Sequence, residues 1–157
     1  MDGTRIRLIS LGLPAVALAA LLSGCGAPGS DSGALTAAGD VFTLTVGHCL
    51  DDADATGEVT SVPIVDCAGP HDSEVFARTE VTGDVFPGGD ALDTELDAFC
   101  QGEAFTEFVG IPFSESAYLT GGYYPTAASW ERGDRELLCT IRAAVGRITG
   151  TLEGVAR

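Results

Sequence analysis

The chain has 157 residues, enough for one domain of ordinary size, and its hydrophobic content of 45% favours a folded domain over a disordered chain. Acidic residues outnumber basic ones by 23 to 8, which gives a formal net charge of −15. A surface this acidic repels the phosphates of nucleic acids, so the composition excludes a nucleic-acid partner.

The N-terminal 24 residues have the pattern of a secretory signal peptide. Two arginines precede the apolar stretch Leu8–Leu22, which is shorter than the ~20 residues that a membrane-spanning helix needs. The stretch ends in Leu22–Cys25, and this run of small residues before a cysteine resembles a bacterial lipobox. The resemblance implies cleavage after Gly24 and attachment of acyl chains such as palmitate to Cys25. A short transmembrane anchor or a buried helix is the alternative.

Lipidation of Cys25 predicts where the chain lies in the cell. Two acyl chains hold a protein stably at a membrane, whereas one chain binds only marginally. The chain is therefore expected at the outer face of the cytoplasmic membrane. Residues 25–40 are small, polar and glycine-rich, which is typical of a flexible tether with a reach of roughly 20 Å. The folded domain is expected to occupy residues 41–157.

Four further cysteines follow the acylation site. An even number of cysteines in an oxidising compartment is typical of disulfide bonds. Four cysteines allow three pairings, and we favour the one that joins neighbouring segments without crossing. The cysteines, in the favoured pairs, are Cys49 with Cys67 and Cys100 with Cys139.

Three segments of alternating apolar residues predict strands in the first half of the domain. They are Val41–Leu50, Gly57–Cys67 and Ser73–Val81, and the first is expected to end at Gly47. Pro63 has no N–H group to donate, which limits the second strand to a sheet edge or a bulge.

The apolar spacing changes to that of an amphipathic helix over Asp90–Gly110. Asp90 is expected to cap this helix, and Cys100 lies on its apolar side. Residues 111–129 predict an irregular loop, because they contain paired glycines and a proline. A strand is expected over Leu137–Val145, and a short one near the C-terminus. The pattern predicts an α+β fold with a small antiparallel sheet, one packed helix and two disulfides in a two-layer single domain.

Few residues are suited to catalysis. The chain has no nucleophile elbow, P-loop or Rossmann glycine pattern, so no catalytic residue, metal or cofactor is predicted. His71 with Asp72 and Glu74 could form a histidine–carboxylate pair, although a histidine in a turn more often bonds its own loop. A zinc site of His71, His48 and two cysteines has no C-x-x-C spacing and is disfavoured where thiols oxidise.

Aromatic residues are the remaining candidates for a binding site. Tyr123 and Tyr124 lie in the predicted loop, where exposed aromatic side chains suit contact with a glycan or a protein. Trp130 follows them, and packing in the core is its more common role. We therefore take His71, Tyr123, Tyr124 and Trp130 as candidate binding residues.

The order of several motifs resembles the septum formation domain family, whose members are lipoproteins and membrane proteins of high-G+C Gram-positive bacteria. The resemblance covers Val46–Gly154. The residues that carry it are Cys49, Cys67, Pro70, His71, Glu74, Val75, Cys100, Pro125, Trp130, Gly133, Asp134, Arg135 and Cys139. It implies a link to cell division and supplies no catalytic residue.

Two functions of different classes follow from these observations. The first is a non-catalytic envelope module that binds a protein or glycan partner, linked to cell division and septum formation. The second is an envelope hydrolase or metal-dependent enzyme that uses His71 and nearby carboxylates. The absence of a nucleophile motif favours the first.

Overall fold

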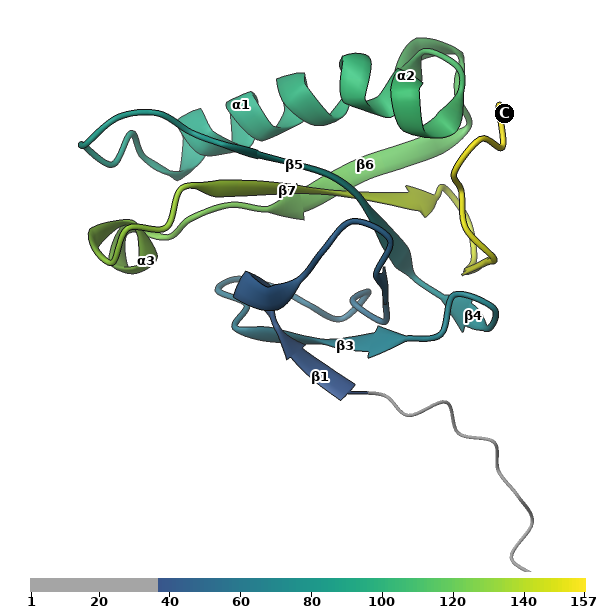
Figure 1. Ribbon diagram of the computed structural model, residues 1–157, viewed down its shortest axis with the longest axis horizontal. Helices are drawn as coiled ribbons and strands as arrows, with labels where there is room; N and C mark the ends of the chain where they lie inside the picture. The colour runs from purple at the N-terminus through teal and green to yellow at the C-terminus, as the bar shows by residue number, and fades with distance from the viewer. Residues whose placement is uncertain (1–36) are drawn as a thin grey trace, which may run out of the picture. The chain divides into compact units, whose positions relative to one another are not determined.

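The computed structural model describes residues 37–157 (Figure 1). The signal peptide predicted for residues 1–24, its acylation site Cys25 and most of the predicted tether lie outside the described residues. The helices and strands follow one another in the order β1 Ala37–Asp40, η1 Val41–Thr43, β2 Cys49–Leu50, β3 Ser61–Val65, β4 Pro70–His71, β5 Ser73–Glu80, α1 Gly89–Cys100, α2 Glu103–Val109, η2 Phe113–Glu115, β6 Tyr118–Tyr123, α3 Ala127–Glu131, β7 Glu136–Ala143 and β8 Ile148–Thr149. Within this part of the chain, no helix is both long enough and apolar enough to cross a bilayer.

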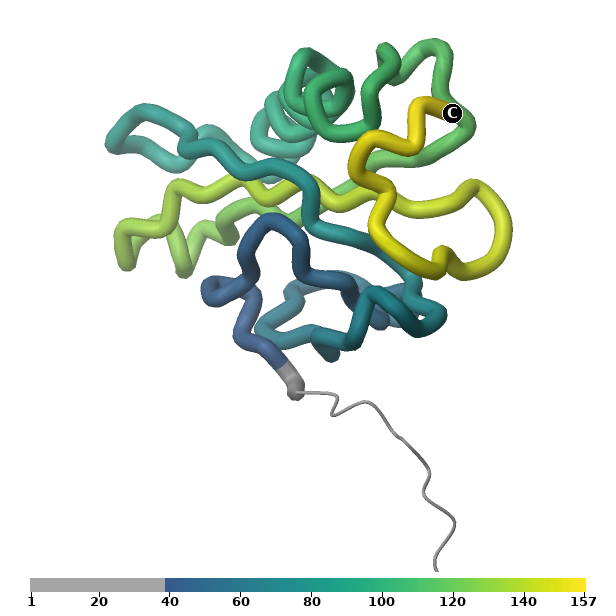
Figure 2. The backbone as a smooth tube through the Cα atoms, turned by 45° about the vertical axis from the view of Figure 1, so that its right-hand side comes forward, coloured from purple at the N-terminus to yellow at the C-terminus, as the bar shows by residue number. Residues whose placement is uncertain are grey.

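The described residues form an α+β domain in which helices cover one face of an antiparallel sheet. Six strands are hydrogen-bonded in the order β1-β3-β2-β5-β7-β6. Helices α1 and α2 lie above β5, β7 and β6, while β1 and β3 lie on the opposite side of these strands (Figures 1 and 2). The sheet therefore curls, and its N-terminal strands turn back under its C-terminal ones. The predicted fold class is confirmed, with a second helix beside the one expected.

Strand β7 separates two hydrophobic clusters because its side chains alternate between the faces of the sheet. Leu137, Cys139 and Ile141 pack with the helices in the larger cluster. Leu138 points the other way, into a smaller cluster that also contains Leu44 of the N-terminal segment. The smaller cluster fills the inside of the curl, so it holds β1–β3 against the rest of the sheet.

The helix predicted over Asp90–Gly110 is interrupted. Gly102 lies between α1 and α2, where a Cβ atom would approach the carbonyl oxygen of Ala98 to 3.0 Å. The expected N-cap at Asp90 is wrong, because the helix begins one residue earlier and Gly88 takes the cap position. Gly110 ends α2 in the left-handed region, with φ of 95°, as the sequence predicted.

The irregular loop predicted for residues 111–129 is wrong, because it contains the edge strand β6 and the short helix α3. Strand β6 pairs with β7 along its whole length, from Tyr118 opposite Ala143 to Tyr123 opposite Leu138. Gly122 permits this pairing, since a Cβ atom there would lie 2.0 Å from the carbonyl oxygen of Leu138. The glycines that predicted a loop are therefore needed for close packing within the sheet.

The strand predicted over Val41–Leu50 is also wrong. Residues Val41–Thr43 form a 3₁₀ turn capped by the Asp40 side chain, and only Cys49–Leu50 pair as a strand. Strand β1 precedes the turn, so Ala37–Asp40, the end of the predicted tether, pairs with β3. The alternating pattern was misleading because Phe42 and Val46 are exposed while Leu44 alone is buried.

Strand β3 explains why β2 is so short. Pro63 lies between two neighbouring strands in the middle of β3, although the sequence restricted it to an edge or a bulge. Its carbonyl oxygen accepts a hydrogen bond from the Asp51 N–H at 3.1 Å, but proline has no N–H to return one. The ladder of paired residues between β2 and β3 therefore stops at Leu50.

Both predicted disulfides are present. Cys49 joins Cys67 within the N-terminal half, and Cys100 at the end of α1 joins Cys139 in the middle of β7. The second bond links the helix layer to the sheet through the larger cluster. The last predicted strand corresponds to β8, which pairs with β4, while β7 stops at Ala143 and leaves Val145 exposed.

Candidate functional site

A groove of about 580 Å³ opens on the face of the sheet opposite the helices. One wall comes from the N-terminal segment, including Phe42 and residues 57–60, and the other comes from β6, α3 and β7. The curl of the sheet brings these two walls together. Volumes of ~300–1,000 Å³ are usual for ligand sites, so the groove is large enough to hold a ligand.

The lining of the groove combines aromatic and acidic side chains. Its aromatic members are Phe42, Tyr123 and Tyr124, its acidic members are Asp52, Glu58, Asp134 and Glu136, and its cation is Arg132. Phe42 and Tyr124 are respectively 56% and 38% exposed, so both rings are accessible to a ligand. The two tyrosines predicted as binding residues thus lie in one cavity.

Tyr123 connects the two walls. Its ring packs against the smaller hydrophobic cluster, and its hydroxyl donates a hydrogen bond of 2.9 Å to Asp52 Oδ2. Burial, followed by the charge of Asp52 and this hydrogen bond, raises the pKa of Tyr123 well above its ordinary value. The phenol therefore stays a neutral donor at physiological pH. Asp52 Oδ1 accepts a second bond of 2.8 Å, from the Ser73 hydroxyl.

Glu136 and Asp134 form the acidic side of the groove. Glu136 forms an ion pair with Arg78 across the β5–β7 ladder. Burial raises the pKa of Glu136, the charge of Arg78 opposes this rise, and the charges of Asp134 and Glu80 add to it. Asp134 accepts hydrogen bonds from the Ser129 hydroxyl at 2.8 Å and the Glu136 N–H at 3.1 Å, as expected for a turn residue.

A smaller cavity of about 390 Å³ adjoins the groove and shares Asp52, Ala55 and Thr140 with it. Asp72 and Arg142 also line this cavity. The side chain of Arg147 forms ion pairs with Asp72, at 3.1 Å, and with Asp51. The neighbouring carboxylates Asp51 and Asp52 therefore have different partners.

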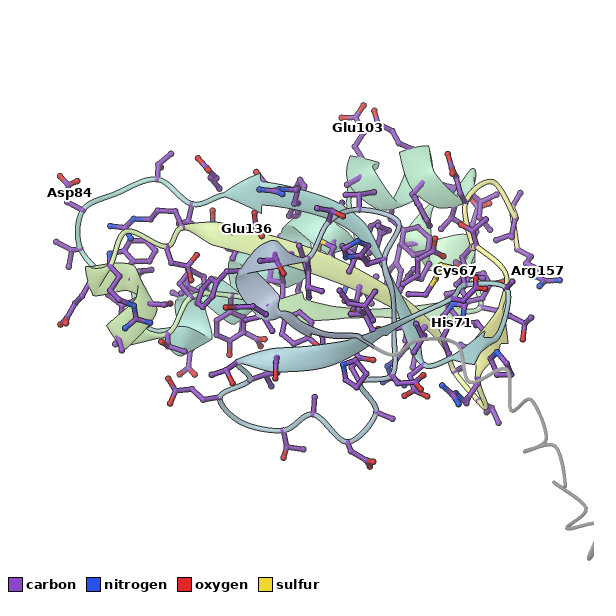
Figure 3. The ribbon with its side chains drawn as sticks, turned by 60° about the horizontal axis from the view of Figure 1, so that its bottom comes forward. Cys67, His71, Asp84, Glu103, Glu136 and Arg157 are labelled. Carbon is purple, nitrogen blue, oxygen red and sulfur yellow. A yellow bond between two sulfur atoms is a disulfide. The ribbon has the colours of Figure 1, made fainter. Side chains whose placement is uncertain are left out.

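His71 lies apart from the groove. In Figure 3, His71 and Cys67 lie at one end of the domain, well away from Glu136 in the groove lining. The side chain is fully buried, and Nδ1 donates a hydrogen bond of 2.9 Å to the Gly69 carbonyl oxygen, while Nε2 has no partner. This is the bond to its own loop that is expected of a turn histidine, and the ring is not exposed to solvent.

One group of three potential metal ligands occurs within residues 37–157. A ring nitrogen of His71, a carboxylate oxygen of Glu74 and the sulfur of Cys49 lie within 4.8 Å of one another. The sulfur belongs to a disulfide, and both Glu74 oxygens accept hydrogen bonds, from the Thr151 hydroxyl and the Leu152 N–H. The sulfur and both Glu74 oxygens therefore already have partners, whereas His71 Nε2 has none. His48, the fourth member of the zinc set considered above, bonds Thr45 instead.

Trp130 is a core residue in the structure. It is 3% exposed, and its indole N–H donates to the Asp84 carbonyl oxygen at 3.3 Å. The guanidinium of Arg135 lies 3.7 Å from the centre of the ring and donates to the Trp130 carbonyl oxygen at 2.8 Å. This arrangement fixes the turn between α3 and β7. Trp130 thereby stabilises the wall of the groove that these two elements help to form.

The sequence did not indicate the acidic members of the groove as binding residues. Asp52 was visible within a run of aspartates, but its partner Tyr123 is 71 residues away in the chain. Glu58 and Glu136 are single acidic residues in ordinary surroundings. Only the curl of the sheet brings them together, and the sequence pattern gave no signal for that curl.

The fold and the groove define a small disulfide-bonded α+β domain with an acidic, tyrosine-lined cavity. Residues 43–155 match the family model described as septum formation, so the chain belongs to the septum formation family. Comparison with curated proteins and with solved structures gives no match.

Proposed function

We propose that the chain is an exported lipoprotein that takes part in septum formation by binding a partner rather than by catalysis. The groove is its binding site, and the acyl chains on Cys25 hold it at the outer face of the cytoplasmic membrane. Family membership supports the link to the septum. The groove, with its exposed Phe42 and Tyr124, is the observation that carries the proposal.

The disulfides support export of the domain. Bonds such as Cys49–Cys67 and Cys100–Cys139 form and persist in oxidising compartments and are rare in the cytosol. The lipobox-like run Leu22–Cys25 provides the cleavage site of the export signal and the cysteine to which the acyl chains are attached. Few residues separate Cys25 from β1 at Ala37, so the domain would remain close to the membrane surface.

The composition of the groove favours recognition over catalysis. Tyrosine provides a large contact area at a small entropic cost, which is why it is enriched where proteins bind partners. The two histidines, the usual general bases near neutral pH, lie outside the groove lining. The alternative enzyme would need a substrate to reach His71, whose side chain is fully buried. The binding module is therefore the function we propose.

Site-specific photocrosslinking in the native cell tests the binding site. A photoreactive phenylalanine analogue at position 42 or 124 is expected to give the same discrete adduct, because both side chains are exposed at the groove. The same analogue at position 145, which is 91% exposed and outside the groove lining, is the matched control. An adduct of equal yield from position 145, or no adduct from positions 42 and 124, would contradict the proposal.

Lipid anchoring is tested by Cys25→Ala. The variant is expected to lose metabolic labelling by a palmitate analogue and to keep its leader, because the dedicated peptidase acts on the acylated cysteine. Intact mass of the membrane-extracted protein gives both results in one measurement. The double variant Arg5→Gln/Arg7→Gln controls for a general export defect. A wild-type mass without acyl chains would show that the anchor is absent.

A further inference from the structure

We infer that the groove binds a peptide segment of a protein partner through a lysine or arginine side chain. This inference rests on the proposed function and specifies the chemistry of the partner. The groove places four carboxylates around one cavity, and its lining has a single cation, Arg132. A cationic side chain is the ligand group that this charge distribution favours most.

The hydrogen bonds inside the groove do not compensate this negative charge. Asp52 accepts from the hydroxyls of Tyr123 and Ser73, and Asp134 accepts from the hydroxyl of Ser129 and a backbone N–H. Neutral donors satisfy the oxygen atoms without cancelling their charge. Among the ion pairs of residues 37–157, only the one between Arg78 and Glu136 involves a carboxylate of the groove.

The exposed aromatic rings suit the rest of a cationic side chain. A lysine or arginine packs its methylene stem on apolar surface and keeps its charged end in a polar environment. Aromatic faces such as those of Phe42 and Tyr124 also attract cations directly. An acidic polymer would be repelled by the same lining, and a neutral sugar would leave the carboxylates without a cation.

Glu58 and Glu136 can be neutralised with little effect on the fold. Glu58 is exposed, and the Arg78 partner of Glu136 is itself largely exposed, so an unpaired Arg78 remains hydrated. Asp52 and Asp134 are unsuitable because Asp52 joins the two walls through Tyr123, and Asp134 accepts the hydrogen bonds that hold the turn before β7. Glu103 of α2 is an exposed carboxylate that Figure 3 shows well apart from Glu136, and it serves as the matched control.

The test measures the binding of fluorescent peptides to the full membrane-extracted chain in neutral detergent by anisotropy. Three glycine–serine peptides of equal length carry two lysines, two norleucines or two glutamates, and a neutral chito-oligosaccharide is the competitor. The lysine peptide is expected to bind best. Glu58→Gln/Glu136→Gln is expected to raise its Kd roughly five-fold, as for two exposed charge pairs, whereas Glu103→Gln leaves the Kd unchanged.

The salt dependence gives a second readout. Charges near a surface are screened over about 8 Å at 0.15 M ionic strength and about 30 Å at 0.01 M, so the lysine peptide should bind more tightly at the lower value. The inference would be overturned if the three peptides bound equally well. It would also be overturned if the neutral oligosaccharide displaced the bound lysine peptide. If position 42 still crosslinks a partner in cells, the proposed function survives that result, so the two failures are distinguishable.

Discussion

Replacing Cys100 and Cys139 together by alanine is expected to lower the free energy of unfolding by about 4 kcal/mol. The bond closes a loop with a sequence separation of 39, and the chain-entropy model assigns this amount to a loop of that length. Small domains have a net stability of ~5–15 kcal/mol, so the variant would lose a large share of it. Both cysteines are almost completely buried, and the missing sulfur atoms add a packing loss to the entropic one.

Urea unfolding of the lipid-free mature chain measures this effect. Trp130 is the only tryptophan, and it lies in the same hydrophobic cluster as both cysteines, so its fluorescence reports on that cluster. The variant Cys49→Ala/Cys67→Ala is the matched comparison. Its shorter separation of 18 predicts a smaller loss, about 3 kcal/mol. A loss below ~1 kcal/mol for the first variant would contradict the assigned role of the bond.

The parts of the fold that the sequence predicted correctly depend on local patterns or on simple chain geometry. Strands β5 and β7 were predicted from apolar residues that alternate in the sequence, although Ser73–Phe76 and Leu137–Ile141 are buried without interruption, and both disulfides join neighbouring segments. The turn at Gly133 and Asp134 also follows a local signal, because glycine and aspartate favour turns. These features require no knowledge of distant parts of the chain.

The largest feature that the sequence missed, strand β6, depends on contacts between distant residues. Strand β6 contains Gly121 and Gly122, which weaken a strand in isolation, and the close approach to Leu138 that requires glycine is visible only in the folded chain. Packing overrode local propensity in β6. The 3₁₀ turn at Val41–Thr43, which exposes Phe42 against the alternating pattern, is instead held by a local bond from the Phe42 N–H to the Asp40 side chain.

The candidate site was predictable only in part for the same reason. Tyr123 and Tyr124 were predicted as binding residues because exposed aromatic side chains in a loop suit contact with a partner. Both line the groove, although Tyr123 ends strand β6 and does not lie in a loop. Trp130 and His71 also have aromatic rings, but both side chains are buried and donate hydrogen bonds to backbone carbonyl oxygens. Residue type alone does not distinguish an exposed aromatic side chain from a buried one, so the structure was needed to separate them.

Glu74→Ala is expected to lower the free energy of unfolding by about 3 kcal/mol. The substitution removes two hydrogen bonds to a charged group, each worth ~1.5–3 kcal/mol, and relaxation of the surrounding residues offsets part of this loss. The Glu74 carboxylate is 2% exposed and accepts from the Thr151 hydroxyl at 2.6 Å and the Leu152 N–H at 2.7 Å. Since Leu152 is 3% exposed, its N–H would be left buried without a partner.

The loss at Glu74 should first affect the C-terminal segment. This segment is also held by backbone bonds from Gly150 to the Cys67 carbonyl oxygen and from Ala156 to that of Val109, and the buried Glu74 carboxylate adds two hydrogen bonds, from Thr151 and Leu152. Glu74→Ala should therefore speed tryptic cleavage after Arg147 before the domain unfolds globally. Glu153→Ala, which removes an exposed carboxylate next to the same contact, is the control. Equal cleavage rates and equal unfolding midpoints in the two variants would show that Glu74 does not anchor the segment, whereas a selective effect would identify this buried carboxylate as the link between the sheet and the C-terminus.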